Sequence, residues 1–161
     1  MDHIREHRSL LANAERRLLV YLARRLPSSV TSDQLSLLGL LSMPAAALAF
    51  VAIPRTWWGA PALVVALAAN WFGDSLDGTL ARVRNQQRPR YGYYVDHAID
   101  LAGTAVLLIG IAASGAMSPV IAMTLLAAYL LVAAETYLAT HAVGVFRISF
   151  AGFGPTELRI V

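Results

Sequence analysis

Long apolar segments separated by short polar ones restrict the folds that this chain can adopt. Four such segments cover about residues 33–53, 56–73, 93–113 and 119–142, each close to the ~20 residues that cross the ~30 Å hydrocarbon core of a bilayer as a helix. Only 14% of the residues are charged and 57% are hydrophobic, whereas soluble domains carry about 25% charged residues. The pattern predicts an all-α fold, a polytopic membrane helix bundle with four membrane helices.

The segment before the first apolar run, residues 1–27, predicts an amphipathic helix. Its apolar residues recur at helical spacing, with arginines between them, at Leu11, Ala14, Leu18, Leu22 and Leu26. Such a helix suits the headgroup region of an anionic leaflet, and a soluble helix packed on a partner is the alternative. The segment lacks the uninterrupted apolar core of a signal peptide.

Arginine is distributed very unevenly along the chain. Twelve of the thirteen basic residues lie in the N-terminal segment, around residues 82–91 or after residue 142, and only Arg55 lies in an opposite loop. By the positive-inside rule, this asymmetry places both termini and the segment around residues 74–100 on the cytoplasmic side. We therefore expect a multi-pass protein of the inner membrane, in which the basic excess sets topology and does not bind nucleic acid.

The end of the sequence has the features of a helix start. Gly154 suits an N-cap, Pro155 suits the first helical position and Glu157 suits the first turn, yet the sequence ends at Val161. We expect the start of a fifth membrane helix here, in a sequence that lacks further membrane helices. A short C-terminal turn is the alternative.

Four aspartates interrupt the apolar pattern within the stretch "DSLDGTLARVRNQQRPRYGYYVDHAID", residues 74–100. Asp74 and Asp77 are three residues apart and Asp96 and Asp100 are four apart, so each pair shares one helix face. A short basic loop joins the two helices, so their ends should lie side by side and bring both pairs together.

Clustered carboxylates at a membrane boundary repel one another unless cations are bound. The chain has no Cys, and hard oxygen ligands favour Mg²⁺ or Mn²⁺. We expect two divalent ions, which would suit displacement at phosphorus. The alternative is that the acids only pair with arginines of the same stretch.

The same stretch also fixes eight residue identities at defined spacings. They read Asp74-x-x-Asp77-Gly78-x-x-Ala81-Arg82 and then Gly92-x-x-x-Asp96-x-x-x-Asp100. This pattern resembles the signature of the CDP-alcohol phosphotransferase (CDP-alcohol phosphatidyltransferase) family. Nine residues separate Arg82 from Gly92, where eight is the commonest spacing in that family, and the extra residue falls in the loop.

The resemblance implies a reaction and a set of roles. An acceptor hydroxyl would attack the β-phosphorus of a CDP-alcohol and release CMP, as in phospholipid biosynthesis. Asp100 would be the catalytic base as well as a metal ligand. The metal ligands would be Asp74, Asp77, Asp96 and Asp100. The residues around the CDP moiety would be Asp77, Gly78, Ala81 and Arg82, with Arg88 and Arg90 as candidate acceptor contacts.

The resemblance also implies the partners. They are a CDP-alcohol, with CDP-diacylglycerol as one candidate, an alcohol acceptor and the lipid bilayer, and we expect a homodimer. Residues 28–161 would form the membrane-embedded catalytic domain. Two alternatives stay open, a Mg²⁺-dependent intramembrane prenyltransferase and a non-enzymatic ion or proton carrier. His97, next to Asp96, is expected to pack or support a ligand and not to bind metal.

The expected topology is testable by cysteine-accessibility labelling, because the natural chain has no Cys. Single cysteines at Arg84 and Ser114 should react from opposite faces of the membrane. Labelling of both from the same face would contradict the topology.

Overall fold

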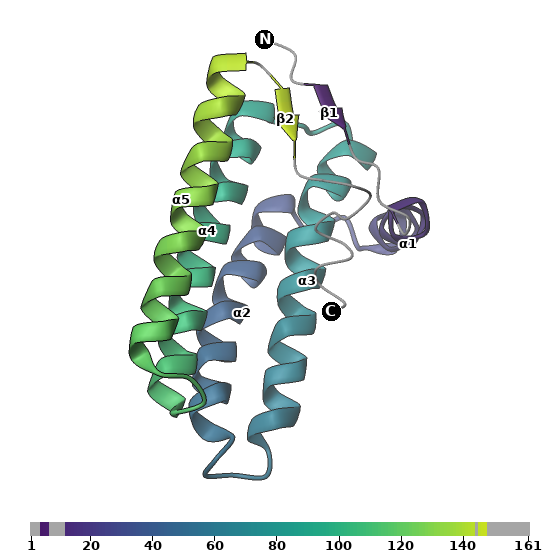
Figure 1. Cartoon of the computed structure of the whole chain (residues 1–161). Coiled ribbons are helices and arrows are strands. Elements are labelled where there is room, and N and C mark those ends of the chain that lie inside the picture. The colour runs from purple at the N-terminus through teal and green to yellow at the C-terminus, as the bar shows by residue number, and fades with distance from the viewer. Residues whose placement is uncertain (1–3, 7–11, 144, 148–161) are drawn as a thin grey trace. The chain divides into compact units, whose positions relative to one another are not determined.

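A computed structural model describes residues 4–6, 12–143 and 145–147, and its helices dominate the fold (Figure 1). The expected start of a fifth membrane helix at residues 154–161 and the apolar position Leu11 lie outside the described residues. The elements, in chain order, are β1 (Ile4–Glu6), α1 (Ala12–Arg25), α2 (Ser32–Ala52), α3 (Gly59–Val83), α4 (Pro89–Ser114), α5 (Pro119–Val143) and β2 (Val145–Arg147).

The chain divides into two compact units. One contains residues 20–127, and with them all of α2, α3 and α4. The other contains residues 1–19 and 128–161, in which β1 pairs with β2 in parallel, Ile4 opposite Val145. The predicted all-α class is confirmed, since the strands of the described chain have only three residues each.

The N-terminal segment is helical over a shorter range than the sequence predicted. The helix α1 begins at Ala12, and Ile4–Glu6 is a strand, so the expectation of one helix through residues 1–27 was wrong at its start. On α1, Ala23 is buried while Leu18 stays 46% exposed. The strand β1 pairs with β2, far along the chain, and the local spacing of apolar residues cannot predict such a pairing.

Local sequence signals fix the ends of the central helices. Thr31 caps α2, because its hydroxyl accepts from the backbone N–H of Gln34 while the Gln34 side chain accepts from the backbone N–H of Thr31. Pro89 occupies the start of α4, where a missing N–H costs nothing. Gly115 ends α4 with a φ of 81°, a conformation that favours glycine.

The helix α2 lies between α3 and α4 and packs on both, whereas α3 and α4 hardly touch each other (Figure 1). Small residues allow the close approach. A Cβ on Gly73 would lie 2.5 Å from the carbonyl oxygen of Leu35 and 2.7 Å from the nitrogen of Gly39. Further along α2, a Cβ on Gly110 would lie 2.5 Å from the Cβ of Ala47. Backbone and side chains of α2 therefore occupy the space that these glycines leave.

Among the residues that the structure describes, three helices are long and apolar enough to cross a membrane, namely α2, α4 and α5 up to Ala142. The sequence predicted four spans, and α3 is the difference. It has 25 residues, but Asp74, Asp77 and Arg82 lower the apolar character of its C-terminal part. Large apolar side chains project outward from several helices, which suits a lipid surrounding. Examples more than half exposed are Leu41, Leu48, Val64, Val65 and Val120.

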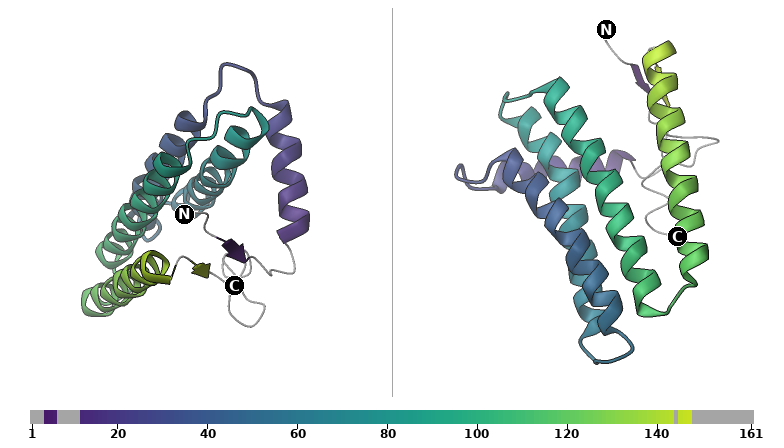
Figure 2. Two further views of the ribbon diagram at one scale, coloured as in Figure 1. Left: turned by 90° about the horizontal axis from the view of Figure 1, so that it is seen from above. Right: turned by 90° about the vertical axis from the view of Figure 1, so that its left-hand side faces the viewer.

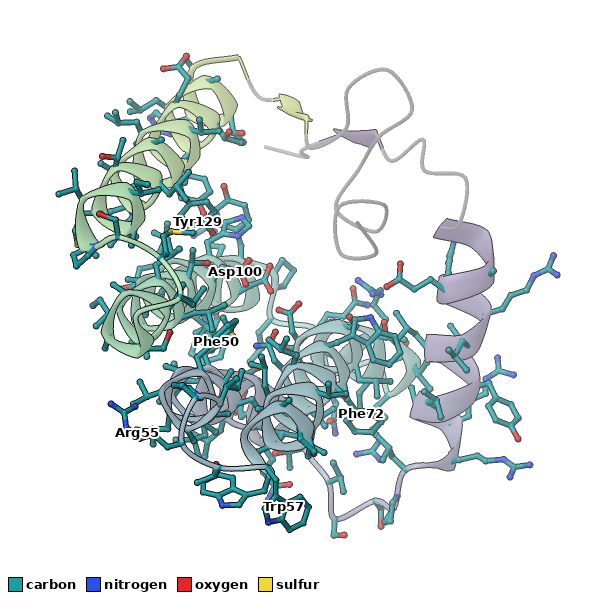
Figure 3. The ribbon with its side chains drawn as sticks, turned by 60° about the horizontal axis from the view of Figure 1, so that its bottom comes forward. Phe50, Arg55, Trp57, Phe72, Asp100 and Tyr129 are labelled. Carbon is teal, nitrogen blue, oxygen red and sulfur yellow. The ribbon has the colours of Figure 1, made fainter. Side chains whose placement is uncertain are left out.

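In the unit of residues 20–127, here called the central unit, the loops lie at two opposite ends, as Figure 2 shows for those flanking α3. The α2–α3 loop carries Arg55 and the exposed Trp57 (Figure 3). At the other end, Arg84 donates to the backbone carbonyls of Leu26, Pro27 and Val30. Arg84 therefore ties the α1–α2 connection to the end of α3, a role that its place in a basic loop did not predict.

The contact at Gly73 makes a stability prediction. Gly73→Ala should destabilise the protein by about 1–3 kcal/mol, because the added methyl group meets backbone atoms of α2 that have no room to move. Thermal unfolding in detergent micelles measures the change. Gly92→Ala is the matched control, since a Cβ there meets nothing within 4 Å. Equal melting temperatures for the two variants would contradict the packing argument.

Candidate active site and metal centre

The four predicted aspartates lie where α3 ends and α4 begins. Asp74 and Asp77 belong to the C-terminal part of α3, and Asp96 and Asp100 follow Pro89 by two and three turns of α4. Asp100 projects from α4 on the side that faces α3 (Figure 3). A loop of only five residues, 84–88, joins the helices, so their aspartate-bearing ends stay near each other.

Three of the four aspartates come together. Asp74, Asp96 and Asp100, here called the three-carboxylate group, each offer an oxygen within 4.8 Å of the others. Asp74 and Asp96 are half-buried and Asp100 is exposed. Two helices thus contribute to one acidic centre that remains open to a ligand.

Asp77 stands outside this group, and other protein atoms hold its carboxylate. The hydroxyl of Ser36 donates to Oδ2 of Asp77 over 2.6 Å, and the backbone N–H of Gly78 donates to Oδ1. The hydroxyl of Ser32 donates to the backbone oxygen of Asp77 over 2.8 Å. The expected convergence of four carboxylates is therefore seen for three, and the fourth is oriented by α2.

The remaining motif residues surround the same end of α3. Arg82 is exposed and donates from Nη2 to the hydroxyl of the buried Thr79 over 3.0 Å. A Cβ on Gly78 would lie 3.8 Å from Nη1 of Arg82, an ordinary contact distance. Ala81 is half-buried. The structure thus leaves the Arg82 guanidinium accessible beside the smallest residue of the motif.

The loop arginines have different surroundings. Arg88 forms an ion pair with Asp33 at the start of α2, and its guanidinium lies 4.3 Å from the ring centre of Tyr91. Arg90 is exposed in the first turn of α4. Both arginines therefore lie at the surface, at the start of α4.

His97 lies beside the acidic centre without joining it. Its Nδ1 is 3.7 Å from Oδ2 of Asp96, and its ring meets the ring of Tyr93 edge-on at 4.2 Å between centroids. The aromatic contact fits the packing role expected from the sequence.

Sequence reasoning missed the serines of α2. Ser32 and Ser36 are one helical turn apart in a mainly apolar helix, and that spacing was the available signal. It was not informative alone, because serine in a membrane helix usually bonds its own backbone, as Ser42 does to the carbonyl of Leu38. The partner lies 41 positions away in the sequence.

The three-carboxylate group suits a hard divalent cation. Like charges this close repel one another, and a bound cation would remove that repulsion. Carboxylate oxygens are the donors that Mg²⁺ and Mn²⁺ prefer, and Mg²⁺ often keeps open positions for water or substrate phosphate. The partly exposed group leaves room for such ligands.

Comparison with known families decides the affiliation. The sequence model described as CDP-alcohol phosphatidyltransferase matches residues 29–160, which is most of the chain. The chain belongs to this family. No individual curated protein matches it significantly.

Membership gives the protein a coarse function. It is a membrane phosphotransferase of phospholipid synthesis, from a family that uses a CDP-alcohol and an alcohol acceptor and depends on divalent metal. The aspartates of this CDP-alcohol phosphatidyltransferase domain all lie within the matched range.

The acidic centre predicts cation binding that depends on particular carboxylates. Asp96→Asn removes one charge and one ligand of the three-carboxylate group, so the affinity for Mn²⁺ should fall at least about tenfold. Electron paramagnetic resonance of free Mn²⁺ measures the binding. Asp33→Asn is the control, because Asp33 is an acid of the same end of the bundle that pairs with Arg88. An equal loss of Mn²⁺ affinity in both variants would mean that the ion responds to general surface charge and not to the three-carboxylate group.

Proposed function

We propose that the protein transfers a substituted phosphate from a CDP-alcohol to the hydroxyl of an acceptor alcohol and releases CMP. The observation that carries the proposal is the three-carboxylate group, formed by family-motif aspartates from two different helices. The family match supports this chemistry over a prenyltransferase or an ion carrier. CDP-diacylglycerol is one candidate donor.

The aspartates would hold two divalent ions, with Asp74, Asp96 and Asp100 contributing directly and Asp77 from its position beside Ser36. Bound ions of this kind neutralise phosphate charge and lower the pKa of a coordinated hydroxyl. The Arg82 guanidinium can bind a phosphate of the nucleotide with two parallel hydrogen bonds. Gly78 and Ala81 would let the CDP moiety approach the helix closely.

Asp100 is the proposed base. It is the exposed member of the three-carboxylate group and lies one turn further along α4 than Asp96, so it is accessible to an acceptor. Its carboxylate would take the proton of the acceptor hydroxyl as that oxygen bonds to the β-phosphorus. The bond from the β-phosphorus to the bridging oxygen breaks, and CMP leaves with the electron pair. Arg88 and Arg90 are proposed to contact an anionic acceptor or donor from the surface.

The proposal includes a location and an organisation. The arginine asymmetry supports an inner-membrane protein with its active site on the cytoplasmic side. Residues 28–161 would form the membrane-embedded catalytic domain, close to the matched range, behind an interfacial N-terminal segment. A homodimer is part of the same proposal.

The base is tested by Asp100→Asn, which keeps the size and one oxygen of the side chain. Release of CMP, measured with a panel of CDP-alcohols and acceptors, should fall about 100-fold or more, because a positioned general base contributes on that scale. Binding of the CDP-alcohol should weaken much less. Chelation should abolish CMP release in the wild type, and Mg²⁺ or Mn²⁺ should restore it.

Asp74→Asn is the comparison, since it should first impair the binding of metal and nucleotide. If Asp100→Asn kept nearly wild-type turnover while Asp74→Asn was inactive, the metal site would stand and the base would be another group. If no CDP-alcohol released CMP, the proposed reaction would be wrong.

A further inference from the structure

Two serines of α2 reach across to Asp77 on α3. The hydroxyl of Ser36 lies 2.6 Å from Oδ2 of Asp77, and the hydroxyl of Ser32 lies 2.8 Å from the backbone oxygen of the same residue. The backbone N–H of Gly78 bonds the other carboxylate oxygen. Both oxygens of the Asp77 carboxylate are therefore held, one of them by a side chain of another helix.

The hydroxyl of Ser36 bonds Asp77 more closely than it bonds the backbone of its own helix. A membrane-helix serine ordinarily bonds the carbonyl one turn back, and Ser36 lies 3.3 Å from the carbonyl oxygen of Ser32. Its contact with the Asp77 carboxylate is much shorter, at 2.6 Å, as expected for a hydroxyl donating to a charged oxygen. Ser42, on the same helix, bonds only within α2 in the described contacts.

Asp77 follows Asp74 by three residues on α3, and Asp74 belongs to the three-carboxylate group. A carboxylate in that position can stabilise a bound cation through its charge and through its remaining lone pairs. Both depend on its orientation. Fixing the side chain in advance removes the loss of rotamer freedom that binding would otherwise incur.

We propose that Ser36 is a positioning residue that orients the Asp77 carboxylate and thereby sets the affinity of the acidic centre for a divalent cation. The inference rests on the proposed metal-dependent function and adds a residue of α2 to its machinery. Hydrogen-bond partners of metal ligands typically change metal affinity 10–100-fold when they are removed.

If Ser36 served only to hold α2 against α3, loss of its hydroxyl would lower the stability of the helix packing. The α2–α3 contact has a separate polar bond, from Nδ2 of Asn70 to the carbonyl of Gly39 over 3.1 Å, in addition to the close glycine packing. Loss of the Ser36 hydroxyl should therefore leave the helices packed and change mainly the cation affinity.

The test compares Ser36→Ala, Ser36→Thr and Ser42→Ala in the full chain, purified in detergent micelles. Mn²⁺ affinity is measured by electron paramagnetic resonance, and thermal unfolding is measured without metal. Ser36→Ala should raise the Kd for Mn²⁺ about tenfold or more. Ser36→Thr keeps the hydroxyl and should restore the wild-type Kd, and Ser42→Ala should bind as the wild type does.

Wild-type Mn²⁺ affinity in Ser36→Ala would overturn the role of Ser36 and leave the proposed function intact. An equal weakening in Ser42→Ala would overturn it as well, because the effect would then be one of helix packing. If Ser36→Ala failed to fold, weak binding by a folded Ser36→Thr would overturn the proposal and wild-type binding would support it. A wild-type protein that bound no Mn²⁺ would overturn the metal site itself together with this inference.

Discussion

The close approach of α2 and α3 at Gly39 and Gly73 is the contact on which the rest of the central unit depends. Only hydrogen atoms at Gly73 let the backbone of α2 come so near, and Asn70 bonds the carbonyl of Gly39 beside it. Within a bilayer, where apolar surface gains little from leaving lipid, such small-residue packing and interhelical hydrogen bonds are the main source of helix association. The same helix contacts α4 further along its length, where Gly110 meets Ala47.

This arrangement decides how the acidic centre is built. Because α2 holds α3 and α4 without pressing them together, carboxylates from both helices face a shared space at the end where a short loop joins them. The helix α2 provides no aspartate to the three-carboxylate group, but its Ser32 and Ser36 hold Asp77, the neighbouring aspartate of α3. Arg84 and the pair of Arg88 with Asp33 fasten the surrounding loops to the same end.

Helix boundaries were largely predictable, because they depend on neighbouring residues. The cap at Thr31, the proline at Pro89 and the left-handed Gly115 are local features, and the observed ends fall within a few residues of the expected ones. The start of α1 was not, since the strand Ile4–Glu6 pairs with residues at the far end of the chain. The span count differed at α3, where the functional charges themselves reduce the apolar signal.

The sequence by itself determined the membrane character, the arginine asymmetry, the family signature and the face shared by each pair of aspartates, because all of these follow from composition and short spacings. The tertiary structure decided which carboxylates meet. It brings Asp74 close to Asp96 and Asp100. It also brings Asp77 into a hydrogen bond with Ser36, 41 positions earlier, and Arg84 into hydrogen bonds with carbonyls more than 50 positions away. Contacts between helices depend on how each helix is rotated about its axis, which the packing of small residues on α2 fixes and helical periodicity does not.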